Sequence, residues 1–328
     1  MTLPELARAL REGVGLQHKR EIQGAGRVLD WSVRGPWGSE TVRLGDDCAA
    51  IPDQDGYLLF AAEGISPELV ASSPRAAGYC SVLVNASDIY AMGGRPLAVV
   101  DAVWSRNADG TQAIVYGMQR AATQLGIPIV GGHTNAHSPY DALAVAILGR
   151  ARSLITSFDA APGDDLLVAL DLRGKMHTAS PFWDATDAPA DRMRDDYAVL
   201  PWLAEQGLCR AGKDISMAGL VGSLLMLLES SAVGAQIELS SIPRAPGIAW
   251  AHWLSAFPSY GFVLSVAPQY SERVMAAFAA RAIACARVGR VDKSRALTLA
   301  DGPDSITLWD LSRETLTRHP DREINEHA

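Results

Sequence analysis

The chain has 328 residues, of which 48% are hydrophobic and 20% charged, and its formal net charge at pH 7 is −8. This length and composition exclude a disordered or fibrous protein and suffice for two domains of roughly 100–200 residues each. Because the anionic chain has no cluster of lysines and arginines, we expect neither nucleic acid nor a membrane surface as a partner. No apolar run is as long as the roughly 18 residues of a membrane span, and the charged first residues lack the apolar centre of a signal peptide, so we expect a cytoplasmic protein.

The first half of the chain alternates between predicted strands and helices. A helix to about Arg11 precedes a glycine-dotted segment up to residue 40, which we expect to be loop-like. Strands are predicted at residues 56–64, 95–104, 127–132 and 141–151, and helices at 73–94 and 110–126. The helix at 73–94 has Ser73 as its cap and Pro74 in its first turn, and a pair of glycines ends it.

Polar and turn residues near 151–163 interrupt this alternation, and a second series of elements follows. Strands are predicted at 165–172, 235–239, 261–266 and 285–292, and helices at 194–208, 217–231 and 270–282. Residues 173–193 form a long polar insertion, and residues 311–328 form a polar tail that we expect to be frayed. The alternation in both halves indicates layers of helix and sheet in two domains.

The four cysteines occur singly, with no C-x-x-C pair among them. They are Cys48, Cys80, Cys209 and Cys285. Neither a disulfide framework nor a structural zinc site is therefore predicted, and we expect these cysteines to be small buried apolar residues.

Acidic residues and glycines recur where predicted strands and helices end. They are Gly45, Asp46, Asp47, Glu63, Asp88 and the run Gly131, Gly132, His133 and Thr134. Carboxylates beside glycines, which allow close approach of a backbone, suit magnesium that bridges nucleotide phosphates. Each site has an ordinary alternative: the Asp46–Asp47 pair could be a solvated turn or helix cap, Glu63 could end a strand, and His133 could be a hydrogen-bonded loop residue.

Asp88 lies near the C-terminal end of its predicted helix, where the helix dipole disfavours a carboxylate. Asn85 lies one turn earlier on the same face. A bound magnesium ion would reverse this local penalty because its charge dominates its surroundings. We therefore predict that Asp88 is a metal ligand shared with the loop that contains Asp46 and Asp47.

The common nucleotide loops are absent: the chain has no G-x-x-x-x-G-K-[ST], and the glycines at 24 and 26 lack the third glycine of a dinucleotide fingerprint. Instead, the order and spacing of "GDDCAAI", "NASDIYAMGGRPLAV", "GIPIVGGHTN" and "LAVAILGRA" resemble the family of aminoimidazole ribonucleotide (AIR) synthetase, selenophosphate synthetase and thiamine-monophosphate kinase. The similarity continues through "APGDDLLVAL", "AGKDISMAGLVGSLL" and "GFVLSVAP" and covers roughly residues 40 to 300.

The resemblance implies an α+β fold with two domains. Its N-terminal domain would have a mixed sheet that pairs with a second copy into a dimeric β-barrel, and its C-terminal domain would be an α/β sandwich. The expected division is an N-terminal helix and loop at 1–40, the ATP and magnesium domain at 41–155, the second domain at 156–310 and the tail at 311–328. The resemblance thus implies a homodimer that binds ATP and Mg²⁺ and acts on a small molecule.

The resemblance also implies roles for single residues. The metal ligands would be Asp46, Asp47, Asp88 and Glu63, with Asp88 and Asp47 as the catalytic pair. The nucleotide-binding residues would be Gly45, Asn85, Gly131, Gly132, His133, Thr134 and Asp214. In the insertion, Lys175, His177 and Asp184 are candidates for contacts with the phosphate acceptor, although a solvated loop explains this segment equally well.

Three departures from the family pattern leave several functions open. Glu63 stands where a kinase-like member has aspartate, and His133 stands where thiamine-monophosphate kinase has aspartate. The early reactive cysteine of selenophosphate synthetase is missing, and Lys19 is the only lysine near that position. The leading hypothesis is a Mg-ATP-dependent phosphotransferase or ligase; the alternatives are a nucleotide-binding paralogue without turnover and thiamine-monophosphate kinase.

Overall fold

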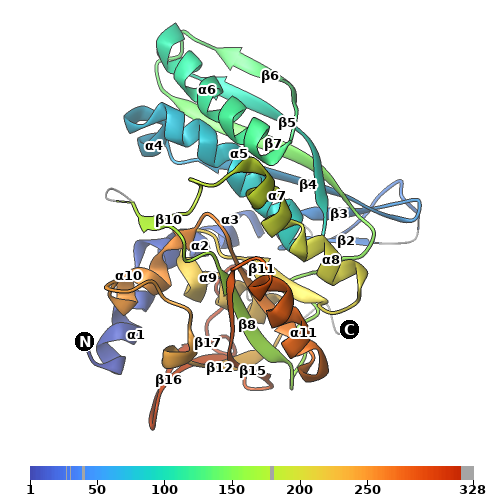
Figure 1. The fold of residues 1–328 in the computed structure, drawn as a ribbon. Helices are drawn as coiled ribbons and strands as arrows, with labels where there is room; N and C mark the ends of the chain where they lie inside the picture. Colours follow the sequence, from blue (N-terminus) through green and yellow to red (C-terminus); the bar gives the residue numbers. More distant parts are fainter. Residues whose placement is uncertain (27, 30, 39–40, 178–180, 319–328) are drawn as a thin grey trace.

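Helices and strands alternate along most of the chain, and the strands form two main sheets, one above the other in Figure 1. The computed structural model describes residues 1–26, 28–29, 31–38, 41–177 and 181–318. The helices are α1 (Leu3–Arg11), α2 (Val14–Arg20), α3 (Ile22–Gly26), α4 (Pro67–Ser72), α5 (Pro74–Ala91), α6 (Ala108–Leu125), α7 (Ala190–Tyr197), α8 (Val199–Glu205), α9 (Gly219–Ser230), α10 (Trp250–Ser255) and α11 (Pro268–Ala279). Within these residues, no helix is both long and apolar enough to cross a lipid bilayer.

The N-terminal sheet has five strands in the order β3-β4-β7-β5-β6. These strands are β3 (Ala49–Asp53), β4 (Gly56–Ile65), β5 (Arg95–Trp104), β6 (Ile129–Asn135) and β7 (Ala142–Ala151). All neighbouring pairs are antiparallel except β5 and β6. Alternate side chains such as Leu59, Val99 and Ile147 are fully buried beneath α5 and α6, as the period of two in a strand requires.

The opposite face of the five-stranded sheet carries large apolar side chains that are exposed. They are Phe60, Leu97, Val100, Val130 and Leu148. Neither main sheet closes into a barrel within the described part of the chain. The dimeric barrel therefore remains a prediction, and this apolar face is the surface on which it depends.

The C-terminal sheet has seven strands in the order β11-β14-β8-β15-β12-β16-β17. These strands are β8 (Asp165–Leu170), β11 (Ala211–Asp214), β12 (Gly234–Glu238), β14 (Gly261–Val266), β15 (Ala284–Asp292), β16 (Ala296–Asp301) and β17 (Asp304–Asp310). Strand β8 is buried along its whole length. Its Leu167 and Ala169 belong to a core shared with α5, α8 and α11, whereas Leu166 and Val168 pack with α1, α9 and α10. Helices on both faces explain why residues 166–170 of this strand are all apolar.

Helix α5 lies between the two sheets, as Figure 1 shows near its centre. Its predicted start at Pro74 is confirmed, and the helix ends at Ala91. Gly93 then adopts φ +75°, which glycine tolerates best, and the Gly94 N–H donates to the Ile89 carbonyl. The helix that carries Asp88 is thus closed by the two glycines that the sequence indicated.

The prediction of a loop over residues 12–40 is wrong for the part that forms α2 and α3. Gly15 lies in α2, where a Cβ atom would come within 2.7 Å of the Ala218 Cα atom. This glycine therefore permits close helix packing against the start of α9, a tertiary role that its local sequence did not reveal. The short strands β1 (Ser32–Arg34) and β2 (Thr41–Arg43) follow as an antiparallel pair.

The polar insertion at 173–193 is also more ordered than predicted. It contributes β9 (Lys175–Met176) and β10 (Phe182–Asp184), which form a small sheet with β13 (Phe257–Pro258). Trp183 is buried against Trp253, with ring centroids 5.2 Å apart in an edge-to-face arrangement. The single helix predicted at 194–208 is instead the pair α7 and α8.

The first part of the predicted frayed tail is packed. The buried carboxylate of Glu229 accepts hydrogen bonds from the backbone N–H groups of Leu316 and Thr317 at 2.6 and 2.8 Å and from the Thr317 hydroxyl at 2.6 Å. Leu316 is itself buried. The polar composition of the tail concealed this partner because Glu229 lies 87 residues earlier in the chain. Residues 319–328 lie outside the described residues.

Candidate functional site

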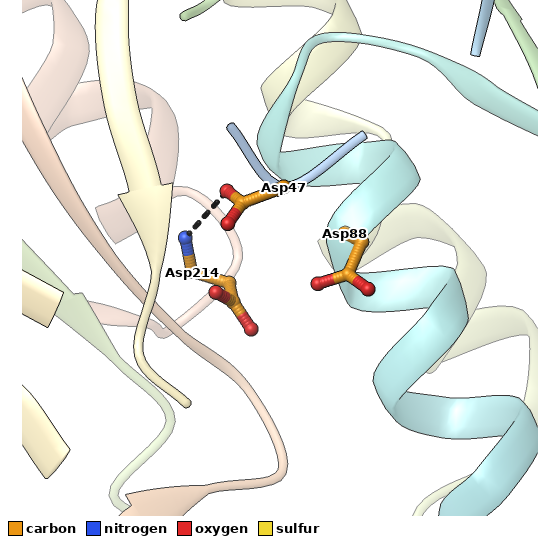
Figure 2. Close-up of side chains that lie close together, drawn as sticks. All are labelled: Asp47, Asp88 and Asp214. Carbon is orange, nitrogen blue, oxygen red and sulfur yellow. Dashed lines mark hydrogen bonds between the residues drawn. The ribbon is translucent and has the colours of Figure 1, made fainter. Parts of the chain in front are cut away.

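Three aspartates from separate elements meet where the two domains face each other. Asp47 lies in the loop before β3, Asp88 on α5 and Asp214 at the end of β11. Each offers a carboxylate oxygen, and these oxygens all lie within 4.8 Å of one another. Figure 2 shows the three side chains converging on one small space. We call this group the aspartate cluster.

Asp88 is the member of the cluster with the least compensation for its burial. Its residue is 6% exposed, and its Oδ2 atom has no hydrogen-bond partner among the described residues. Burial, followed by the charges of Asp214 and Asp47, raises the pKa of Asp88 well above its ordinary value. Asn85 is in a similar state: its Nδ2 donates to the Ser81 carbonyl at 2.8 Å, but its Oδ1 is buried without a partner.

Asp46 does not join the cluster although it adjoins Asp47. Its carboxylate accepts hydrogen bonds from the Ser157 hydroxyl at 2.7 Å and from the Ser157 N–H at 3.0 and 3.1 Å. Burial and the nearby Asp47 raise the pKa of Asp46 to about 6. The predicted acidic pair is therefore divided: Asp47 faces the cluster, and Asp46 fastens its loop to the segment between the domains.

Lys213 brings a positive charge into the cluster. Its Nζ donates to Oδ1 of Asp47 in an ion pair, and both side chains are 3% exposed. Burial acts to lower the pKa of Lys213, but the charges of Asp47, Asp214 and Asp46 prevail and raise it above its ordinary value. Lys213 is therefore an ammonium ion at neutral pH.

Asp214 contributes to the cluster through both its backbone and its side chain. Its N–H donates to Oδ2 of Asp47 at 3.3 Å, the bond drawn as a dashed line in Figure 2. Burial, followed by the charge of Asp47, raises the pKa of Asp214 to about 8. The sequence indicated this residue as a nucleotide contact, and the structure places it beside Asp47 and Asp88.

Lys19 of α2 is a second lysine beside the aspartate cluster. Its Nζ lies 3.3 Å from the Ser216 hydroxyl, and the side chain is partly buried. Burial and the charge of Lys213 lower its pKa, whereas Asp214 and Glu63 act in the opposite direction. The helix that the sequence did not predict thus directs a cation toward the site.

The remaining predicted nucleotide and metal residues lie at varied places in the N-terminal domain. Gly45, with φ +100°, introduces the loop of Asp46 and Asp47. Glu63 is an exposed residue of β4 outside the aspartate cluster. Gly131, Gly132, His133 and Thr134 are exposed in β6, an edge strand of the five-stranded sheet, and the His133 ring lies 6.0 Å from that of Trp104.

The three candidate acceptor contacts lie in or beside the small sheet of the insertion. Lys175 is exposed and opposite Asp184 in the antiparallel register, and His177 follows β9. Asp184 accepts hydrogen bonds from the Thr186 hydroxyl and N–H at 2.7 and 2.9 Å. These bonds show a turn-stabilising role for Asp184, and its function in acceptor binding stays a prediction.

The donor set of the aspartate cluster fits magnesium. Mg²⁺ prefers oxygen ligands at about 2.0–2.1 Å, so ligands on opposite sides of the ion are roughly 4.2 Å apart. The three carboxylates, with oxygens within 4.8 Å of one another, need little movement to surround such an ion. The unpartnered Oδ2 of Asp88 supports this fit because a buried carboxylate oxygen without a donor is costly unless a cation compensates it.

Two domain models define the class of this protein. Residues 45–151 match the N-terminal domain of AIR synthase related proteins, and residues 184–302 match the C-terminal domain of the same family. The chain therefore belongs to the AIR synthase related family, as the sequence motifs indicated. Both domains, in this order, contribute to the aspartate cluster.

One relative matches the chain over nearly its whole length, and two others carry the names of enzymes. An uncharacterized protein of Synechocystis sp. is 50% identical over 317 residues, which cover 96% of this chain and 98% of the relative. Thiamine-monophosphate kinase of Halobacterium salinarum is 30% identical over 261 residues, covering 76% of this chain and 88% of the relative. Selenide, water dikinase of Bordetella bronchiseptica is 29% identical over 247 residues, covering 68% and 70%.

Solved structures share the fold at low sequence identity. PurL of Thermotoga maritima complexed with ATP has a TM-score of 0.71 and 19% identity, covering 98% of this chain and 53% of that chain. The chain thus spans about half the length of this PurL. AaThiL complexed with AMPPCP and TMP has a TM-score of 0.62 and 16% identity, covering 81% and 92%. These likenesses establish the AIR synthase fold.

Proposed function

We propose that the protein is a Mg-ATP-dependent phosphotransferase or ligase that acts on a small metabolite. The observation that carries the proposal is the aspartate cluster, in which the buried Oδ2 of Asp88 has no partner among the described residues. Family membership supports nucleotide use, because relatives are named kinases and a similar structure is complexed with ATP. The proposal retains Asp47 and Asp88 as the central acidic residues and adds Asp214 as a third ligand.

In this proposal, Asp47, Asp88 and Asp214 hold Mg²⁺, which when bound neutralises and aligns the β- and γ-phosphates of ATP. Lys213 fixes the orientation of Asp47 by its ion pair. Lys19, beside Ser216, supplies a cation where the transferred phosphoryl group needs charge compensation. The protein's contribution is therefore mainly positioning and electrostatic stabilisation.

We also propose that two copies pair through the apolar face of the five-stranded sheet. Exposed contiguous apolar surface of this kind is typical of an interaction site, and Val130 and Phe60 are 63% and 49% exposed in the single chain. The predicted nucleotide residues at 131–134 lie in the same sheet, on the edge strand β6. A dimer that uses this face would bring β6 close to the partner's surface.

Calorimetric titration with ATP and MgCl₂, followed by ADP release with a panel of small-molecule acceptors, tests the enzyme proposal. We expect Mg-ATP binding that requires Asp88 and ADP release stimulated by one class of acceptor. Thiamine monophosphate belongs in the panel, because its phosphorylation would identify the distant kinase relative as the better guide to function. Binding without turnover across the panel would favour the non-catalytic paralogue, and absence of Mg-ATP binding would refute the proposal.

A further inference from the structure

We infer that Lys213 acts as a built-in cation that restricts the aspartate cluster to a single divalent ion. The inference rests on the proposed magnesium site and goes beyond it by assigning the number of ions and the residue that sets it. Its basis is the ion pair between Lys213 and Asp47, in which both side chains are 3% exposed. The ammonium occupies the side of Asp47 that a second ion would need.

The two oxygens of Asp47 have different surroundings. Within the described residues, Oδ1 accepts a hydrogen bond from the Lys213 ammonium, whereas Oδ2 accepts only one from the Asp214 N–H, at 3.3 Å. Carboxylates often bridge two cations by giving one oxygen to each. In this chain Oδ1 of Asp47 already binds one cation, the ammonium of Lys213 in β11.

Asp46 adjoins Asp47 and would be the additional ligand for a second ion. Both of its carboxylate oxygens accept hydrogen bonds from Ser157. The carboxylate oxygens that face one another belong to Asp47, Asp88 and Asp214. One octahedral ion can take these three protein ligands and fill its other positions with water and phosphate. Asp46 Oδ2 accepts only one of the bonds from Ser157, at 3.0 Å, so it keeps a lone pair, and the ammonium on Oδ1 of Asp47 decides between one ion and two.

Lys213 is also held in place. Lys213 lies in β11 and is opposite Val263 of β14 in the antiparallel register. Lys213 is also buried. A second ion at Oδ1 of Asp47 would have to displace an ammonium that has little access to water. Such displacement is unfavourable because a buried charge without its partner is strongly destabilised.

The test counts bound Mn²⁺ ions by electron paramagnetic resonance in nucleotide-free protein. We expect one ion per wild-type chain and two per chain in Lys213→Met, since methionine has a similar length but no charge. Lys213→Arg retains the cation and should bind one ion. Lys293→Met, at an exposed lysine after β15, is the matched control and should also bind one ion.

Two ions in the wild type, or one ion of unchanged affinity in folded Lys213→Met, would overturn the inference. If neither protein binds an ion, the proposed metal site itself fails, so the two failures are distinguishable. Should Lys213→Met not fold, anomalous diffraction from wild-type crystals with Mn²⁺ decides the question. One peak, with the Lys213 ammonium still on Asp47, supports the inference, and a second peak at Oδ1 of Asp47 refutes it.

Discussion

The buried ion pair between Lys213 and Asp47 joins the two domains at the aspartate cluster. Asp47 precedes the first strand of the five-stranded sheet, and Lys213 lies in the edge strand β11 of the seven-stranded sheet. The pair therefore links domain docking to the composition of the site. We therefore expect the loss of either charge to alter both.

Removal of the Lys213 charge should destabilise the metal-free protein. In Lys213→Met the buried carboxylate of Asp47 loses its counter-ion, and breaking a buried pair typically costs about 3 kcal/mol or more. Urea unfolding in EDTA measures the loss, and added Mg²⁺ should recover much of it. Lys293→Met provides the control, and equal stability of the two variants in EDTA would contradict this account.

Replacement of Asp88 by asparagine should weaken Mg-ATP binding more than folding. The substitution keeps the shape of the side chain and removes one of the three carboxyl groups of the cluster, whose Oδ2 has no donor within the described residues. We expect at least about a tenfold loss of Mg-ATP affinity, or roughly 1.4 kcal/mol, with an unchanged or higher melting temperature. Calorimetry and thermal unfolding are compared with Asp304→Asn, at an exposed aspartate of β17. A large fall in melting temperature with intact binding would assign Asp88 a structural role.

The metal-free protein should become less stable as the pH rises from about 4 to about 8. The pKa of Asp46 is raised to about 6 and that of Asp214 to about 8, so the folded state retains protons that the unfolded state has released. Raised folded-state pKa values stabilise the protein below the ordinary aspartate pKa, and this stability is lost as the pH passes through the raised values.

Thermal unfolding in EDTA between pH 4 and pH 8 measures this dependence. In Asp214→Asn the fall in melting temperature should be smaller, because one of the titrating groups is gone. Mg²⁺ at pH 8 should restore stability to the wild type by compensating the charged carboxylates. An identical pH profile in Asp214→Asn would show that Asp214 does not contribute.

A charge on the apolar sheet face should prevent dimer formation. Val130 is 63% exposed in β6, and glutamate there would place an unpaired charge in the proposed interface. Light scattering after size-exclusion chromatography should give a dimer for the wild type and a monomer for Val130→Glu. Val14→Glu, at an exposed valine of α2, is the control and should remain dimeric. A monomeric wild type would remove the basis of the dimer proposal.

Glu229 should anchor the segment that precedes the chain's C-terminal residues. Glu229→Ala removes the acceptor of three hydrogen bonds and leaves the N–H groups of Leu316 and Thr317 without it. A loss of about 2–4 kcal/mol in the free energy of unfolding is expected, since hydrogen bonds to a charged group are worth more than neutral ones. Urea unfolding checks this against Glu12→Ala, an exposed control. Equal stability of the two variants would contradict the anchoring role.

Local patterns predicted the elements whose signals lie within a few residues. Helix α5 follows its proline start and glycine end, and β14 follows its apolar run. The same approach missed α2, because the glycines that suggested a loop permit tight packing against Ala218. It also treated residues 311–317 as tail, because their partner Glu229 is remote in the chain.

From the amino-acid sequence alone we could predict the family, the order of the two domains and the presence of acidic residues at particular helix and strand ends. The family and its domain order follow from the resemblance of the sequence motifs to known proteins, whereas local periodicity and glycine placement predict the helices, the strands and their ends. Packing of the two sheets brings Asp214 to Asp47 and Asp88, Asp46 to Ser157, and Lys213 into the site. Lys213 and Asp47 are 166 residues apart, and no local pattern specifies such a contact because it depends on how two separately formed sheets dock.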